Sequence, residues 1–240
     1  MDLGQLERRR VSEDWRWCLR EFGWLDELSE LEIAAIPPAG RCSDVAPGVV
    51  VFAPERSPDS VFLLRSGLVR MYRLSRAGDE LSLGFVGPQE IFGEQSGFSG
   101  FPRESYAITV TPCRIYEIPQ DTFLHLVENH ARLLLEITNT ISRRAKRIEG
   151  RLAARIFHDA FARTCALLFE LCEDFGRRIR GGTLIDAPMT QSELASLMGS
   201  VRQTVSPHIR RLEEMGAISR RRGCWLIEKP EELERLASGG

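Results

Sequence analysis

Four side chains near the carboxyl end of this 240-residue chain have the chemistry needed to read DNA bases. They are Arg202, Gln203, Ser206 and Arg210, and helical spacing places them on one face. Arginine can make two parallel hydrogen bonds to guanine, and glutamine can do the same with adenine. A solvated helix face often carries the same residue types, so the prediction depends on the elements that hold this row.

The surrounding residues, 189–212, indicate two short helices joined by a tight turn. Thr190 followed by Glu193 forms one capping box, and Ser200 followed by Gln203 forms a second. Gly199 suits the left-handed conformation at which the first helix ends. The apolar faces of the two helices consist of Leu194, Leu197 and Met198, and of Val205, Ile209 and Leu212. This is the helix-turn-helix pattern, whose second helix enters the DNA major groove.

Two residues of the second helix fit this pattern less simply. A Gln203 side chain that closes a capping box is not free to contact a base. Pro207 removes the hydrogen bond that its nitrogen would donate to the Gln203 carbonyl oxygen, and an interior proline costs about 3 kcal/mol in an ordinary helix. We therefore expect a kink or a loosened first turn.

Residues 217–228, AISRRRGCWLIE, predict a β-hairpin with arginines at its tip, which is a wing. Arg221 and Arg222 would then lie on the phosphate backbone, which orients the protein without specifying sequence; alternatively, they only make the turn soluble. Between Thr190 and Trp225 six arginines face three glutamates, a local excess of three positive charges in a chain of net charge −2. The predicted DNA-binding set is Thr190, Gln191, Ser200, Arg202, Gln203, Ser206, Arg210, Arg221 and Arg222.

The rest of the composition argues against several classes of protein. The charged start MDLGQLERRR predicts no signal peptide, and no apolar run approaches the roughly 20 residues of a membrane span. The six cysteines are scattered without a C-x-x-C pair, which argues against zinc and a disulfide framework and favours the cytoplasm. Because no triad order, nucleophile elbow, metal-ligand spacing or phosphate-loop lysine occurs, we expect neither an enzyme nor a bound metal or cofactor.

Four regions follow from the hydrophobic patterns, and together they predict an α+β fold. Residues 15–36 have a helical pattern ended by two prolines, and residues 45–118 hold short strand-like runs typical of an antiparallel jelly roll that can enclose a small-molecule pocket. We predict a helical cap at 1–36, a β jelly roll at 37–119, a long helix at 120–157 and a winged helix-turn-helix domain at 158–240.

Apolar residues on the long helix recur in steps of three and four, which is a heptad seam. A core helix within one domain would look similar, but the polar flanks at Arg143 and Lys146 favour a narrow seam and therefore a homodimer. The predicted dimerisation set is Leu134, Ile137, Ile141, Ala145, Ile148 and Leu152.

From about Trp17 to Ile227 the chain resembles the cyclic-AMP receptor protein/FNR (CRP/FNR) family of bacterial transcription regulators. The resemblance rests on SGLVRMYRLSRAGDELSLGFVGPQEIFGEQSGF in the roll and LASLMGSVRQTVSPHIRRLEEMGAIS near the end. It implies a homodimer on a near-palindromic operator in double-stranded DNA, with RNA polymerase as a further partner. The family's frequent Arg-Glu…Arg reading set becomes Arg202-Gln203…Pro207 here, so its usual base preference cannot be carried over.

The resemblance also implies an effector site between the roll and the long helix. In the family a Phe-Gly-Glu and a later Arg-Ser bind the sugar and phosphate of cyclic AMP. Here Gly93, Glu94 and Arg103 match, while Glu104 replaces the serine and would repel a phosphate. Arg103 would hold another anion or pair with a neighbouring glutamate.

On the long helix, Ile148 and Glu149 stand where the family has its adenine-contacting Thr-Ser pair, and neither supplies a hydroxyl. We therefore expect an effector other than cyclic AMP, or none. The candidate effector set is Gly93, Glu94, Arg103, Glu104 and Ile148. An alternative function is a small-molecule-sensing module that acts through a partner protein rather than DNA.

Overall fold

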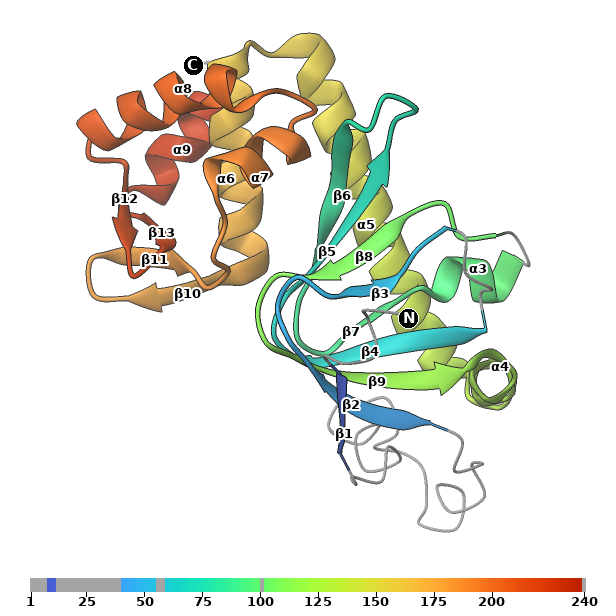
Figure 1. Ribbon diagram of the computed structural model, residues 1–240. Helices are drawn as coiled ribbons and strands as arrows, with labels where there is room; N and C mark the ends of the chain where they lie inside the picture. Colours follow the sequence, from blue (N-terminus) through green and yellow to red (C-terminus); the bar gives the residue numbers. More distant parts are fainter. Residues whose placement is uncertain (1–7, 12–39, 55–58, 100–101, 239–240) are drawn as a thin grey trace. The chain divides into compact units, whose positions relative to one another are not determined.

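The structure, a computed structural model, describes residues 8–11, 40–54, 59–99 and 102–238 (Figure 1). They divide into two units, one of residues up to 73 together with 84–144, and one of residues 74–83 and 145–240. The helix predicted at 15–36 lies outside the described residues. Within the predicted cap, Arg8–Val11 forms a strand, β1, because its backbone pairs antiparallel with Arg41–Val45.

Two antiparallel sheets form the predicted roll, and all of their residues except those of 74–83 belong to the first unit. One sheet has the order β1-β2-β9-β4-β7 and the other β3-β8-β5-β6. The strands after β1 are β2 (Arg41–Val45), β3 (Val50–Phe52), β4 (Ser60–Ser66), β5 (Val69–Leu74), β6 (Glu80–Val86), β7 (Glu90–Phe92), β8 (Tyr106–Thr109) and β9 (Cys113–Pro119). The longer apolar runs within residues 45–118 all form strands. The structure also contains β2 and β7, which those runs did not predict.

The roll has two apolar clusters because alternate residues of its strands point to opposite faces. One cluster contains the stacked rings of Phe52, Phe62 and Phe92. The other joins β4, β7 and β9 to α4 (Gln120–Asn129) and the start of α5 (Ala131–Phe157). The prediction of a single helix over 120–157 is wrong in one respect, because the backbone of His130 is extended and separates α4 from α5.

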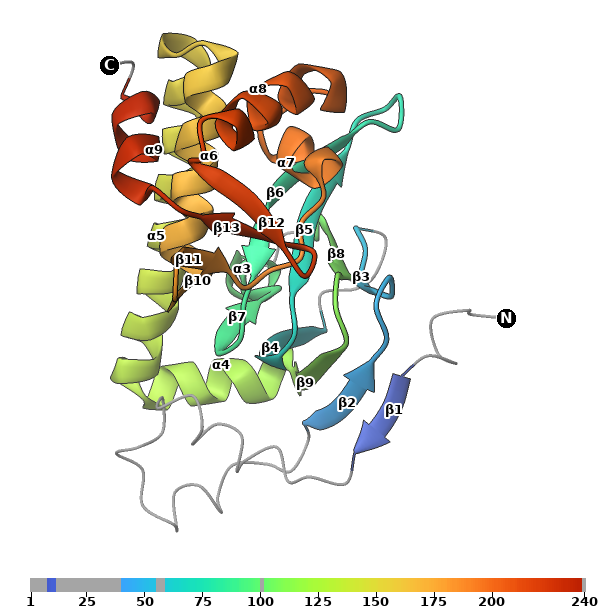
Figure 2. The same cartoon turned by 90° about the vertical axis from the view of Figure 1, so that its left-hand side faces the viewer.

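The second unit builds a helical layer and a small sheet around one core (Figure 2). Its helices include α6 (Ala160–Phe175), α7 (Gln191–Leu197), α8 (Arg202–Glu214) and α9 (Pro230–Ala237). The sheet has the order β10-β11-β13-β12, with strands Gly176–Ile179, Gly182–Ile185, Cys224–Ile227 and Ile218–Arg221 respectively. Trp225 is fully buried and anchors the predicted wing, β12–β13, to this core. Among the helices of the described ranges, none has the length and apolar character needed to cross a bilayer.

Candidate nucleic-acid interface

The start of α7 is fixed by the predicted capping box. The Thr190 hydroxyl oxygen accepts a hydrogen bond from the Glu193 backbone nitrogen at 3.2 Å, and the Glu193 carboxylate accepts one from the Thr190 nitrogen at 2.6 Å. Two backbone donors that a helix end leaves without partners are thereby satisfied. The side chains of Thr190 and Gln191 are held at the amino end of a rigid helix.

The second predicted capping box is absent. α8 begins at Arg202 after Val201, whose side chain makes no capping hydrogen bond. Ser200 instead completes the end of α7: its nitrogen donates to the Ala195 carbonyl oxygen at 2.9 Å, and the Gly199 nitrogen donates to Ser196 at 3.1 Å. With Gly199 at φ +58°, this is a Schellman motif. The Gln203 side chain is therefore not used for capping, and the conflict seen in the sequence disappears.

α8 has one buried face and one exposed face, as the sequence predicts. Val205, Ile209 and Leu212 are fully buried against α6 and α7. Arg211 is exposed, and its guanidinium stacks on the ring of Phe161 in α6, 4.1 Å from the ring centre. We call the outward-facing set the recognition face; it consists of Arg202, Gln203, Ser206, Pro207 and Arg210, and these residues line one open hollow of about 420 Å³.

Ser206 is a connector within this face. Its hydroxyl lies 2.7 Å from the Gln191 side-chain oxygen and 2.9 Å from the Arg202 carbonyl oxygen, and its single hydrogen is shared between these two acceptors. Because the Gln191 oxygen accepts this bond, its amide nitrogen is the end available for another acceptor. Ser206 thus links the recognition helix to the start of α7.

The wing supplies a residue that the sequence analysis missed. Arg220 pairs across the hairpin with Trp225, its guanidinium lies 3.5 Å from the centre of a Trp225 ring, and it donates to the Gly223 carbonyl oxygen at 2.6 Å. With Arg202 and the residues at the start of α7 it lines a second hollow of about 380 Å³. The sequence run of Arg220, Arg221 and Arg222 does not indicate which arginine lies on the same face of the hairpin as Trp225.

The two arginines predicted at the wing tip are both exposed. Arg221 ends β12, while Arg222 and Gly223 form the turn with φ values of +51° and +84°. Positive φ at both central residues is typical of a type I′ hairpin turn. The hairpin therefore presents Arg221 and Arg222 to solvent beside the Arg220–Trp225 stack.

The predicted effector residues of the roll are occupied by contacts within the chain. Arg103 is buried, lies 4.1 Å from the centre of the Phe52 ring, and donates to the carbonyl oxygens of Ser60 and Gly93. Gly93 has φ +78°, and a Cβ there would come within 2.6 Å of the Arg103 guanidinium. We call Phe52, Ser60, Phe62, Gly93 and Arg103 the Arg103 cluster.

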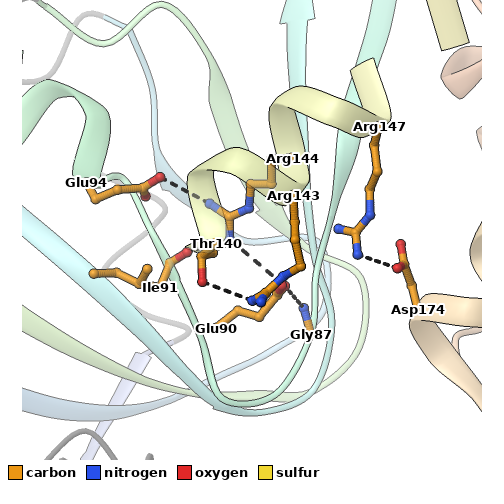
Figure 3. Close-up of polar contacts among 9 residues, drawn as sticks. All are labelled: Gly87, Glu90, Ile91, Glu94, Thr140, Arg143, Arg144, Arg147 and Asp174. Atoms are coloured by element: carbon orange, nitrogen blue, oxygen red, sulfur yellow. Dashed lines mark hydrogen bonds and ion pairs between the residues drawn. The ribbon is translucent and has the colours of Figure 1, made fainter. Parts of the chain in front are cut away.

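Beside this cluster, Glu94 pairs with an arginine of α5 (Figure 3). One carboxylate oxygen accepts from Arg144 at 3.2 Å, and Arg144 also donates to the Ile91 carbonyl oxygen and lies 3.9 Å from Glu90. Burial raises the pKa of Glu94, and the charge of Arg144 opposes that rise. Within the described residues the second Glu94 oxygen has no hydrogen-bond partner. The sequence analysis did not predict that Arg144 pairs with Glu94, because the spacing of Arg144 also fits a position of the heptad seam.

The remaining effector candidates lie elsewhere. Glu104 is exposed and pairs with Arg73 at 3.1 Å rather than with Arg103. Ile148 belongs to the second unit and is 46% exposed. The structure therefore brings Gly93, Glu94 and Arg103 together and leaves Glu104 outside that group.

The predicted dimerisation residues fall into two groups. Ile137 is buried in the roll core and Ile141 packs partly against it, so these two side chains contact the chain itself. The others are exposed along one side of α5, and Ile156, 68% exposed, extends the row. We call Leu134, Ala145, Ile148, Leu152 and Ile156 the α5 stripe.

Comparison with known proteins agrees with this arrangement. Residues 43–130 match the cyclic nucleotide-binding domain family, and residues 162–236 match the Crp-like helix-turn-helix domain family. The chain is 30% identical over 219 residues to a CRP-like cAMP-activated global transcriptional regulator of Mycobacterium tuberculosis, covering 91% of this chain and 98% of that protein.

Two solved structures show the same architecture. A CRP/FNR-family transcriptional regulator from Thermus thermophilus is 29% identical, with a TM-score of 0.65 over 82% of this chain and 98% of that chain. A CooA mutant from Carboxydothermus hydrogenoformans has a TM-score of 0.73 at 19% identity, over 95% of this chain and 98% of that chain, and shows likeness of fold alone.

Proposed function

Because this chain belongs to the CRP/FNR family of DNA-binding transcription regulators, we propose that it binds a near-palindromic operator as a homodimer and acts without cyclic AMP. The recognition face carries this proposal. Its arginines and glutamine are exposed on a helix whose other face is buried, so they are positioned for base edges in a major groove. Family membership favours this function over the alternative of a sensing module that acts only through a partner protein.

The α5 stripe supports the homodimer. Leu152 and Ile156 are 59% and 68% exposed, although their apolar side chains lie on a long amphipathic helix. Apolar residues in such a row gain free energy when a second copy of the helix covers them. Two recognition helices related by a two-fold axis would then meet two half-sites of one operator.

The contacts of the roll support the absence of cyclic AMP. Glu94 and Arg103, charged side chains that are buried in the roll, are already paired or stacked within the chain. A cyclic nucleotide at this site would have to displace these contacts. We propose that the protein works in the cytoplasm, where bacterial DNA and RNA polymerase are found, with no effector or with one of another chemistry.

Selection from random double-stranded oligonucleotides tests the DNA-binding proposal. We expect a two-part, near-symmetric consensus whose affinity falls steeply with salt, because arginines release counterions from the phosphates. Failure to enrich any sequence would contradict it. Calorimetry with cyclic AMP should show no binding, and DNA affinity should not change on its addition; micromolar binding coupled to DNA would overturn the effector proposal.

Sedimentation of two matched variants tests the homodimer. Leu152→Glu places a charge in the α5 stripe and should give monomers that bind a full operator weakly. Leu135→Glu changes the same residue type, 63% exposed, at a position about 100° from Leu134 around the helix, and should remain dimeric. Equal sedimentation of both variants and the unchanged protein would exclude this interface.

A further inference from the structure

Pro207 lies exposed in the middle of the recognition face, where a base-reading helix would be expected to carry a donor or acceptor. It occupies the sixth position of α8 and lines the same 420 Å³ hollow as Arg202, Gln203 and Arg210. The exposed side chain gains little from packing in the core, and its ring removes a backbone hydrogen bond from the helix. The fold itself therefore gives no reason for a proline here.

Polar side chains flank Pro207, but the side chain of Pro207 itself has no polar group. Arg202 and Gln203 lie one turn toward the amino end, and Arg210 lies almost one turn toward the carboxyl end. Ser206, its neighbour in the chain, directs its hydroxyl hydrogen to Gln191 and to the Arg202 carbonyl oxygen. The middle of the face consequently presents an apolar ring between hydrogen-bonding side chains.

The major groove contains one apolar group at its base edges, which is the 5-methyl group of thymine. Cytosine presents an amino group there, and a purine presents acceptors that an apolar ring would leave without a partner. We propose that Pro207 is a specificity-determining residue that selects a thymine by contact with its methyl group. This inference rests on the proposed DNA-binding function.

The helix geometry places this thymine relative to the other contacts. Gln203 and Pro207 are four residues apart, which is about 6 Å along the helix axis and equals at most roughly two base-pair steps of about 3.4 Å along the DNA. The selected thymine should therefore lie within about two base pairs of the pair contacted by Gln203, once in each half-site.

Removal of single methyl groups from the operator tests the proposal with the full-length protein. The operator is the consensus obtained by selection, and each thymine is replaced in turn by uracil, which lacks only the methyl group. At one position per half-site we expect the dissociation constant to rise about three- to fivefold, the effect of one lost apolar carbon contact. Replacement of thymines in the flanking DNA should leave affinity unchanged.

Variants of Pro207 then connect that position to this residue. Pro207→Asn should reduce the uracil penalty to less than 1.5-fold, and Pro207→Arg should change the selected base from thymine to guanine. Pro230→Ala, a proline change at the start of α9 in the same unit, is the matched control and should keep the original preference.

The outcomes distinguish failure of the thymine assignment from failure of the proposed function. If the protein selects an operator but no uracil replacement weakens binding, the thymine assignment is overturned and the proposed function stands. The same holds if Pro207→Arg selects an unchanged base. If no sequence is selected at all, the proposed function itself fails. The uracil series uses the unchanged protein, so it decides the assignment even if a variant does not fold.

Discussion

The recognition face and the roll both contain arginines, yet they use them in opposite ways. Arg202 and Arg210 are exposed on α8, and their hollow opens to solvent. Arg103 and Arg144 have their guanidinium groups turned onto carbonyl oxygens, aromatic rings and a carboxylate of the same chain. A buried arginine whose terminal nitrogens donate to groups of its own chain stabilises a fold, although the Nε atoms of Arg103 and Arg144 have no hydrogen-bond partner within the described residues. An exposed row on a helix can instead meet an external partner.

The same contrast separates the two halves of a typical sensor-regulator. In this chain the helix-turn-helix half presents exposed arginines, of which Arg202 matches the family's pattern, while the arginines of the roll make contacts within the chain. If the buried arginines are structural and the exposed ones functional, substitutions in the two regions should change different properties of the protein.

Replacement of Arg144 should give the largest effect, and on stability. Arg144→Met leaves Glu94, 1% exposed, as a charge without its partner, and should lower the free energy of unfolding by about 3 kcal/mol. Urea unfolding followed by circular dichroism measures this. Arg73→Met, which removes an exposed partner of Glu104, is the matched control and should cost less than about 1 kcal/mol.

The pH dependence of that variant has a definite sign. Burial raises the pKa of Glu94 above its ordinary value of 4.5, and loss of the Arg144 charge raises it further. A carboxyl with a raised folded-state pKa destabilises the fold progressively as pH rises from the unfolded-state value through the folded one. The deficit of Arg144→Met should therefore be smaller at pH 4 than at pH 8. A deficit independent of pH would show that the carboxylate is not its cause.

Replacement of Arg202 should affect binding and leave stability unchanged. Arg202→Ala should cost about 1–3 kcal/mol at one base pair per half-site, and should relax specificity there. Fluorescence anisotropy with the selected operator measures this. Arg178→Ala removes the same charge from the exposed strand β10 of the same unit and should have little effect. Equal losses in the two variants would mean that Arg202 contributes charge alone.

Substitution of Thr190 and of Ser200, the hydroxyl residues on either side of α7, should lower the free energy of unfolding by different amounts. Thr190→Ala removes an observed helix cap and should cost about 1 kcal/mol. Ser200→Ala should cost almost nothing, because Ser200 takes part in the Schellman motif through its backbone. Calorimetric unfolding compares the two; a larger cost at Ser200 would contradict the observed start of α8.

The smallest effect is expected at the wing tip. Arg221→Ala should weaken binding nearly uniformly across DNA sequences, and should reduce the slope of log affinity against log salt by about one per half-site. A change in base preference instead would assign Arg221 to base reading and not to the phosphate backbone.

Local sequence signals predicted the DNA-binding half well. Thr190 and Glu193, Gly199, and the buried faces of both helices each express a preference that acts within a few residues, and they agree with one another. The second predicted capping box is absent although Ser200 and Gln203 have the right spacing. The backbone of Ser200 belongs to the Schellman motif that ends α7, so Ser200 is not the N-cap of α8.

Such local signals do not predict contacts between residues that are far apart in the sequence. The sequence by itself determined the order of the roll, the helical region after it and the winged helix-turn-helix, the amphipathic faces and the row of exposed polar side chains on α8, because these depend on spacing along the chain. Only the tertiary structure decided that Arg144 pairs with Glu94 and that Ile137 belongs to the roll core. Each of these contacts joins segments whose meeting depends on packing rather than on sequence period.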